Sequence, residues 1–206
     1  MTLRRGEDWG ALGALPAAAR EARGDAEAAR IAERGRAEGV TPPVLLRGGD
    51  LWRTCGGGPQ SPAGGAVAIL PVDVGVAALD GKERVFVAHL VARGRSAWFG
   101  PLLAVCNAQY RGSWDLAPRS HPADGVLDVV EVGSMSLPDR WRAWRRLPTG
   151  THVPHPAIAQ RRVREATFTF SRPRRIWLDG EPAGTATEVA VRAEPAALTV
   201  CLAASG

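Results

Sequence analysis

The stretch "RRIWLDGEPAG" (174–184) places an Asp-Gly pair between two apolar, strand-like segments. Such a pair favours a two-residue β-hairpin turn, because both central residues of that turn adopt positive φ. Asp179 and Gly180 therefore predict two antiparallel strands that meet at this point. Glu181 follows directly, so the turn carries two acids, either as turn residues or as groups held out for chemistry.

Similar short strands and turn signals extend over most of the chain before this hairpin. A second Asp-Gly pair, at 80–81, joins the runs "AVAILPVDVGVAAL" (66–79) and "ERVFVAHLVARG" (83–94). Further runs cover 99–110, 126–133, 163–170 and 187–202. One helix is expected among them, at 137–146, with Leu137, Trp141 and Trp144 on one face. The pattern predicts an α+β, predominantly β fold over residues 65–206: an antiparallel β-sandwich or open barrel with one helix.

The first 64 residues show a different pattern. "DAEAARIAERGRAEG" (25–39) is typical of a helix that Asp25 caps and Gly39 ends. "VTPPVLLRGGD" (40–50) predicts a buried strand that enters a glycine turn, with Asp50 as the N-cap of the next helix. The Gly/Pro-rich stretch 56–65 is the best candidate for an internal boundary or a loop. We therefore expect residues 1–64 to form a small α/β unit before the β-rich domain.

The composition constrains the partners and the compartment. The net charge is +5, but Lys82 is the only lysine, a bias typical of a GC-rich genome, so no nucleic-acid partner is expected. A basic surface can still favour anionic lipid. No run of about 18 apolar residues and no secretory signal is present. Three widely spaced cysteines favour reduced thiols. We expect a cytoplasmic protein, with peripheral association at the inner membrane surface left open.

Six segments resemble, in order, the C-terminal β domain of the bacterial diacylglycerol kinase and sphingosine kinase lipid-kinase family. They are "LPVDVGVAALDG" (70–81), "RVFVAHLVARG" (84–94), "AVCNAQYRGSWDLAP" (104–118), "HPADGVLDV" (121–129), "LPTGTHVPHPAI" (147–158) and "RRIWLDGEPAGTATEVAVRAEPAALTV" (174–200). The resemblance implies transfer of a phosphoryl group from ATP to a lipid hydroxyl.

The resemblance also implies roles for three acids. Glu181 would be the general base that takes the hydroxyl proton, and Asp179 would fix the turn or a metal. Asp124, on the acidic loop, would hold Mg²⁺ together with Asp179. On this interpretation Asp124 and Glu181 lie close in space, although 57 positions separate them.

The nucleotide site is where the chain departs from the family. "RGGDLWRTCGGG" (47–58) resembles one of the family's two glycine loops and supplies the candidate cofactor-binding residues Gly48, Gly49, Asp50, Arg53 and Thr54. The other loop has no counterpart, so residues 1–64 resemble a truncated nucleotide-binding domain and a complete ATP site is not expected.

Two functions remain open from the sequence. The favoured one is a lipid-kinase-like protein that binds an acyl lipid or a phospholipid surface without a complete ATP site. The alternative is an active, Mg²⁺-dependent lipid kinase whose nucleotide domain is completed by a partner or by a second copy of the chain. Trp98 and Trp114 flank a central strand, where they serve either core packing or an apolar cleft for acyl chains.

Overall fold

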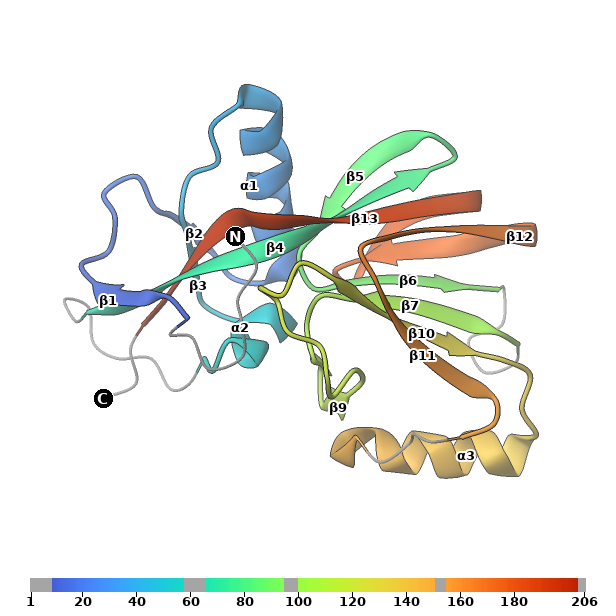
Figure 1. The fold of residues 1–206 in the computed structure, drawn as a ribbon. Helices are drawn as coiled ribbons and strands as arrows, with labels where there is room; N and C mark the ends of the chain where they lie inside the picture. The colour runs from blue at the N-terminus through green and yellow to red at the C-terminus, as the bar shows by residue number, and fades with distance from the viewer. Residues whose placement is uncertain (1–8, 58–65, 95–99, 151–154, 204–206) are drawn as a thin grey trace.

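One large sheet dominates the computed structural model, which describes residues 9–57, 66–94, 100–150 and 155–203 (Figure 1). Within these residues the sheet has eleven strands. They are β1 (Ala11–Gly13), β2 (Arg20–Ala22), β3 (Val44–Leu46), β4 (Val67–Leu79), β5 (Lys82–Phe86), β6 (His89–Arg93), β7 (Leu102–Cys106), β10 (Leu127–Val132), β11 (Ile158–Val163), β12 (Glu165–Leu178) and β13 (Glu181–Ala203). β8 (Tyr110–Arg111) and β9 (Trp114–Asp115) form a separate pair. The predicted predominantly β fold is confirmed.

Both Asp-Gly pairs form the predicted hairpin turns. Asp80 (φ 46°) and Gly81 (φ 88°) join β4 to β5, and Asp179 (φ 49°) and Gly180 (φ 85°) join β12 to β13. All four residues have the positive φ that this turn requires. The main path through the sheet runs β1-β4-β13-β12-β6-β7-β10-β11, and neighbours along it pair antiparallel.

The long strand β13 connects the two ends of the molecule. Its first part pairs with β12, and it pairs along most of its length with β4. Near its end, Val200 pairs in parallel with Val44 of β3. A register shift between Glu194 and Leu198, where Ala196 has φ 50°, bends the strand between these two parts. The N-terminal strands therefore belong to the same sheet as the last strand, while the division at residue 64 stays a prediction.

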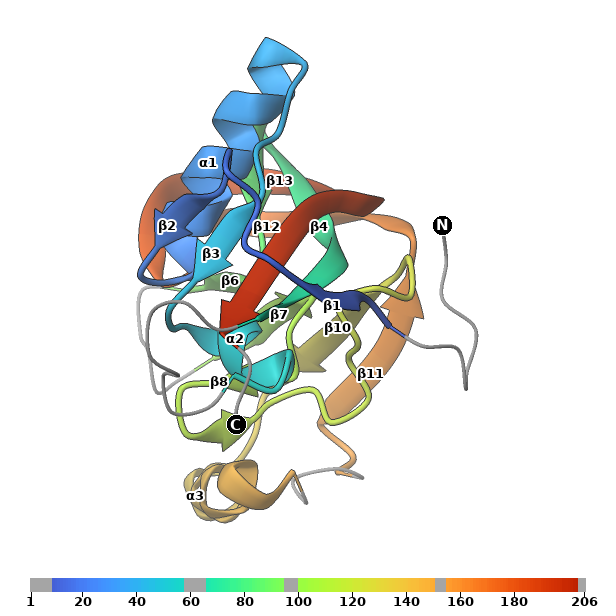
Figure 2. The same cartoon turned by 90° about the vertical axis from the view of Figure 1, so that its left-hand side faces the viewer.

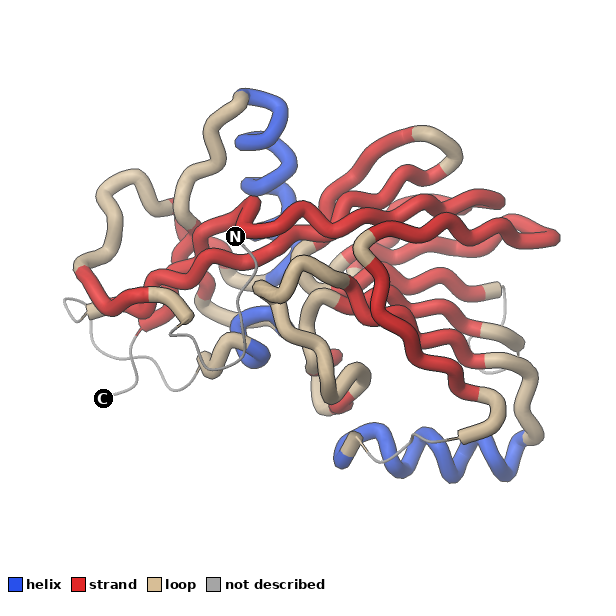
Figure 3. The backbone as a smooth tube through the Cα atoms, in the orientation of Figure 1, coloured by secondary structure: helices blue, strands red, loops and turns tan. Residues whose placement is uncertain are grey.

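Two helices cover one end of this sheet. α1 (Asp25–Glu38) and α2 (Asp50–Thr54) pack on a core that includes Ala28, Leu51 and Val200. A second core lies between the strands farther along the sheet and contains Phe86, Leu127 and Ile176. Figure 3 shows the strands of this sheet in red and the helices in blue.

The predicted helix at 137–146 is present as α3 (Leu137–Arg146), followed by the 3₁₀ turn η1 (Leu147–Thr149). Ser136 caps it by accepting a hydrogen bond from the Asp139 amide. α3 has no buried residue, and Leu137 and Trp141 are more than half exposed. α1 and α3 lie at opposite ends of the molecule in both ribbon views (Figures 1 and 2). None of the helices in the described segments is long and apolar enough to cross a membrane.

Candidate functional site

The carboxylate of Asp179 binds three consecutive backbone amides. Oδ2 accepts from the Val87 amide at 2.8 Å, and Oδ1 accepts from the amides of Ala88 and His89 at 2.8 and 2.9 Å. The Asp179 amide in turn donates to the His89 carbonyl at 2.8 Å. Burial raises the pKa of Asp179 to about 6. Asp179 therefore fastens the β12–β13 turn to the β5–β6 connection, and both of its oxygens are occupied by this task.

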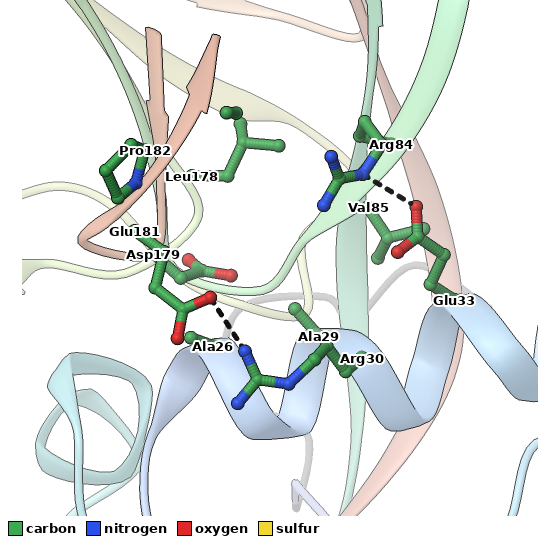
Figure 4. A pocket seen from close by; sticks show the side chains of 11 residues that line it. Ala26, Ala29, Arg30, Glu33, Arg84, Val85, Leu178, Asp179, Glu181 and Pro182 are labelled. Carbon is green, nitrogen blue, oxygen red and sulfur yellow. Dashed lines mark hydrogen bonds and ion pairs between the residues drawn. The ribbon is translucent and has the colours of Figure 1, made fainter.

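Glu181, two residues later, has a different environment. Its carboxylate pairs with Arg30 of α1 at 2.7 Å, and both side chains are more than half exposed. Figure 4 shows this pair at one side of a small pocket, with the Arg84–Glu33 pair across from it. The pocket has a volume of about 40 Å³. That volume is too small for a nucleotide or a lipid chain.

Asp25 caps a different helix from the one predicted. The N-cap of α1 is Gly24, which makes no side-chain cap. The Asp25 carboxylate instead accepts from the first amides of α2, those of Asp50 at 2.6 Å and Leu51 at 3.1 Å. Burial raises the pKa of Asp25 to about 7, and the negative charge of Asp179 adds to the shift. The prediction that Asp25 caps its own helix is wrong, because the start of α2 lies against its side chain.

The glycine turn before α2 is explained by this contact. The predicted strand-to-helix turn is present, but the N-cap of α2 is Gly49 and not Asp50. Gly49 has φ 104°, and a Cβ at this position would collide with the Asp25 carboxylate. A Cβ added to Gly48 would lie 3.0 Å from the carbonyl oxygen of Arg23. Close packing inside the protein therefore requires glycine at position 49 and leaves little room for a side chain at position 48.

The other candidate cofactor residues contact the segment 109–112. The Asp50 carboxylate accepts from the Gly112 amide at 2.6 Å. Arg53 donates to the Gly112 carbonyl and stacks on the Tyr110 ring, 4.1 Å from its centroid. The Thr54 hydroxyl accepts from the Gln109 amide at 3.1 Å and donates to the Asp50 carbonyl at 2.8 Å. These three side chains bind α2 to residues 109–112, which include β8 and the start of the turn to β9.

Asp124 has contacts that are separate from those of Asp179 and Glu181. It forms an ion pair with Arg162 of β11, and Arg162 also lies 3.8 Å from Asp128. No contact in the described segments joins Asp124 to Asp179 or Glu181. Nor do those segments contain a group of three His, Cys, Asp or Glu side chains that could hold a metal ion. A magnesium site shared by Asp124 and Asp179 therefore stays a prediction from the resemblance.

Three buried polar residues near the Asp179 contact were missed by the sequence analysis. The Asn107 amide group donates to the carbonyls of Asp73 and Val87 at 2.8 and 2.9 Å. The Asp73 carboxylate accepts from the amides of Gly125 and Ala196. His89 lies 3.6 Å from the Asp50 carboxylate, and burial lowers its pKa to about 3, so the ring is neutral. A polar residue inside an apolar strand, such as Asp73 in 66–79, was the available signal.

A much larger cavity lies between α3 and the sheet. Its volume is about 430 Å³, within the range of roughly 300–1,000 Å³ typical of ligand pockets. Most of its lining is apolar: Leu102, Ala104, Trp114, Leu116, Val130, Val132, Met135, Ala143, Trp144, Leu147 and Ile158. The remaining lining residues are Arg93, Arg111 and Arg140. We call this space the α3 cavity. Trp114 lines it as the acyl-cleft interpretation requires, whereas Trp98 lies outside the described residues.

Comparison with known proteins identifies similar domains. The family model of the YegS C-terminal NAD kinase beta sandwich-like domain matches residues 70–202. No curated protein matches the sequence. The solved structure "A putative diacylglycerol kinase from Bacillus anthracis str. Sterne" is similar with a TM-score of 0.64 and 14% identity, covering 90% of this chain and 78% of that chain. A diacylglycerol kinase structure from the same organism is similar with a TM-score of 0.55 and 16% identity, covering 78% of this chain and 67% of that chain. At these identities the structural likeness shows the fold.

Proposed function

Because the chain belongs to the family of the YegS C-terminal NAD kinase beta sandwich-like domain, we propose that it is a diacylglycerol kinase-like protein that binds an acyl lipid in the α3 cavity. The predicted resemblance to the C-terminal domain of the lipid-kinase family is confirmed by this match. The single observation that carries the proposal is the cavity itself. Its apolar lining and its volume of about 430 Å³ suit a hydrocarbon chain.

The proposal includes the absence of an autonomous ATP site. A phosphate cradle needs free backbone amides and side-chain groups that face the ligand. The first amides of α2 are bound by Asp25, and Asp50, Arg53 and Thr54 are bound to the segment 109–112. These residues therefore do not fit a triphosphate in the arrangement that the chain adopts. We propose no step of phosphoryl transfer through them.

The separation of the two pockets supports a binding role further. Glu181, the candidate base, lines the small pocket beside α1, and the two pockets share no lining residue. A general base has to reach the hydroxyl whose proton it takes, within hydrogen-bond distance or through one water. Because the two linings are separate, we propose that Glu181 does not act as a base on a lipid held in the α3 cavity.

A lipid titration with a cavity-filling variant tests the proposal. Calorimetric titration with laurate and with monolauroylglycerol measures binding to the wild type. Ala143 on α3 lines the cavity, so Ala143→Trp fills it and is expected to weaken binding at least tenfold. Ala37→Trp places the same side chain on an exposed position of α1 and is expected to leave binding unchanged. Equal affinities in the wild type and Ala143→Trp would show that lipid does not enter the cavity.

An active lipid kinase, completed by a partner or a second copy, is the second candidate. The observation that favours it is Glu181, whose exposed carboxylate is not consumed by backbone contacts, unlike that of Asp179. Transfer of radiolabelled phosphate from Mg²⁺-ATP to diacylglycerol tests it. Turnover by the wild type that disappears in Glu181→Gln would make this candidate the correct one. The same assay, with and without Mg²⁺, tests the predicted cofactors.

Association with an anionic membrane surface is proposed for α3. The helix exposes Leu137, Trp141 and Trp144. Arg142, Arg145 and Arg146 are exposed on the same short helix, and Arg145 stacks 4.8 Å from the centre of the Trp141 ring. Exposed tryptophan and arginine on one helix suit the boundary between lipid headgroups and chains. The helix that covers the α3 cavity would then face the source of the lipid.

A further inference from the structure

Three arginines line the α3 cavity without an acidic partner. They come from separate elements: Arg93 from β6, Arg111 from β8 and Arg140 from α3. The Arg93 guanidinium stacks on the Trp177 ring, 4.1 Å from its centroid, and Arg140 donates to the Gly100 carbonyl at 2.9 Å. Among the described residues, no carboxylate forms an ion pair with any of the three. Within these residues, therefore, none of the three guanidinium groups is held in an ion pair.

This lack of partners is not a general shortage of acids. Elsewhere in the described segments, eight arginines form ion pairs: Arg30, Arg36, Arg47, Arg84, Arg142, Arg161, Arg162 and Arg192. The contrast is sharpest at Arg111, which is only partly exposed and whose guanidinium makes no hydrogen bond within the described segments. Burial lowers its pKa, and the positive charge of Arg93 lowers it further. The negative charge of Asp50 opposes this shift, but Asp50 forms no ion pair with Arg111, and its carboxylate accepts a hydrogen bond from the Gly112 amide.

From this arrangement we infer that the α3 cavity selects single-chain lipids with an anionic headgroup, a carboxylate or a phosphate. The apolar lining takes the chain, and the guanidinium groups of Arg93, Arg111 and Arg140 bind the headgroup oxygens. Guanidinium groups match both headgroups geometrically, since they donate two parallel hydrogen bonds to such oxygens. The same charges repel the ammonium group of a sphingoid base. The inference deepens the proposed function and rests on it.

The size of the cavity favours one chain over two. If a methylene group takes about the 30 Å³ that a water molecule has in the liquid, 430 Å³ holds one chain of roughly fourteen groups. A diacyl lipid would leave its second chain outside. Fatty acids and lysophosphatidic acids therefore share the chemistry that the cavity suits.

Competition among four lipids tests the inference on the wild-type protein. Calorimetric titration compares laurate, lauroyl lysophosphatidate, monolauroylglycerol and sphingosine under identical buffer conditions. We expect both anionic lipids to bind at least about tenfold more tightly than the neutral one, and sphingosine to bind least. Comparing laurate with the lysophosphatidate identifies which oxyanion the site prefers. Equal binding of monolauroylglycerol, or a preference for sphingosine, would overturn the inference while leaving the proposed function intact.

Charge-removing variants locate the effect. Arg93→Gln with Arg111→Gln is expected to weaken the anionic lipids at least tenfold and to leave monolauroylglycerol within about twofold. Arg142→Gln with Arg145→Gln also removes two charges, from exposed positions of α3 that do not line the cavity, and is expected to change neither affinity. Arg140→Gln, on the exposed helix, repeats the test if the double variant folds poorly. Equal loss for anionic and neutral lipids contradicts headgroup selection. If no lipid binds the wild type, the proposed function fails and the inference fails with it.

Discussion

Replacing each acid of the β12–β13 turn separately should destabilise the protein to very different extents. Asp179→Ala removes the acceptor of three amides, those of the buried residues Val87, Ala88 and His89. Glu181→Ala removes only an exposed ion pair with Arg30. The two positions also differ in backbone conformation, because Asp179 has φ 49° in the turn whereas Glu181 begins β13, so the strain of alanine at position 179 needs a control of its own.

The structure gives the expected magnitude for Asp179→Ala. Each buried amide left without an acceptor costs about 1–3 kcal/mol. Burial of the carboxylate opposes this loss: its pKa of about 6 lies roughly two units above the ordinary value, or about 3 kcal/mol at neutral pH. We expect a net decrease of roughly 3 kcal/mol in the free energy of unfolding. For Glu181→Ala we expect less than about 1 kcal/mol, as for other exposed ion pairs.

Urea denaturation at pH 7.5, followed by circular dichroism, measures both values. Asp80→Ala is the matched control, because Asp80 has φ 46° in the other Asp-Gly turn and Asp179 has φ 49°. Alanine is strained equally at both positions, so this contribution cancels. Asp80 accepts hydrogen bonds from Thr187 and Glu188, but it is exposed, and water can replace it there. The reasoning is refuted if Asp179→Ala and Asp80→Ala destabilise the protein equally, or if Glu181→Ala is the most damaging of the three.

Three further predictions concern Asp25, Gly49 and α3. The pKa of Asp25 is about 7 in the folded protein and near 3.9 in the unfolded chain, so its contribution to stability is present below about pH 4 and is lost as the pH rises through about 7. Asp25→Asn should therefore become more stable relative to the wild type when the pH is raised from 5 to 8. Urea denaturation at both pH values measures the stability difference, and a difference that does not change with pH contradicts the prediction. Gly49→Ala should lower the melting temperature, because its Cβ would meet the Asp25 carboxylate at φ 104°, whereas Gly56→Ala, with φ 84° and open space, should lower it less. Trp141→Ala should reduce sedimentation with phosphatidylglycerol vesicles several-fold, whereas Trp9→Ala, outside α3, should not. If Trp141→Ala sediments as the wild type does, α3 is not the docking helix.

The sequence determined the elements whose signals are local. Asp80-Gly81 and Asp179-Gly180 specify hairpin turns because positive φ is a property of the two turn residues themselves. The helix at 137–146 followed from the spacing of its apolar residues, Leu137, Trp141 and Trp144. The resemblance to the lipid-kinase family depended on the order of such segments, which is also written in the chain. These features need no knowledge of distant contacts.

Only the tertiary structure decided what each acid does. Asp80 and Asp179 occupy equivalent turns, yet one is exposed and the other binds the amides of residues 87–89. The sequence suggested that Asp25 caps its own helix, but in the structure it caps α2. The parallel pairing of β2 with β3 brings the start of α2 against the Asp25 side chain. The α3 cavity also depends on position, because its lining comes from β6 to β11 and from α3. Sheet order and register bring these partners together, and both follow from packing among residues that are distant in sequence, such as Asp179 and residues 87–89, at least 90 positions apart.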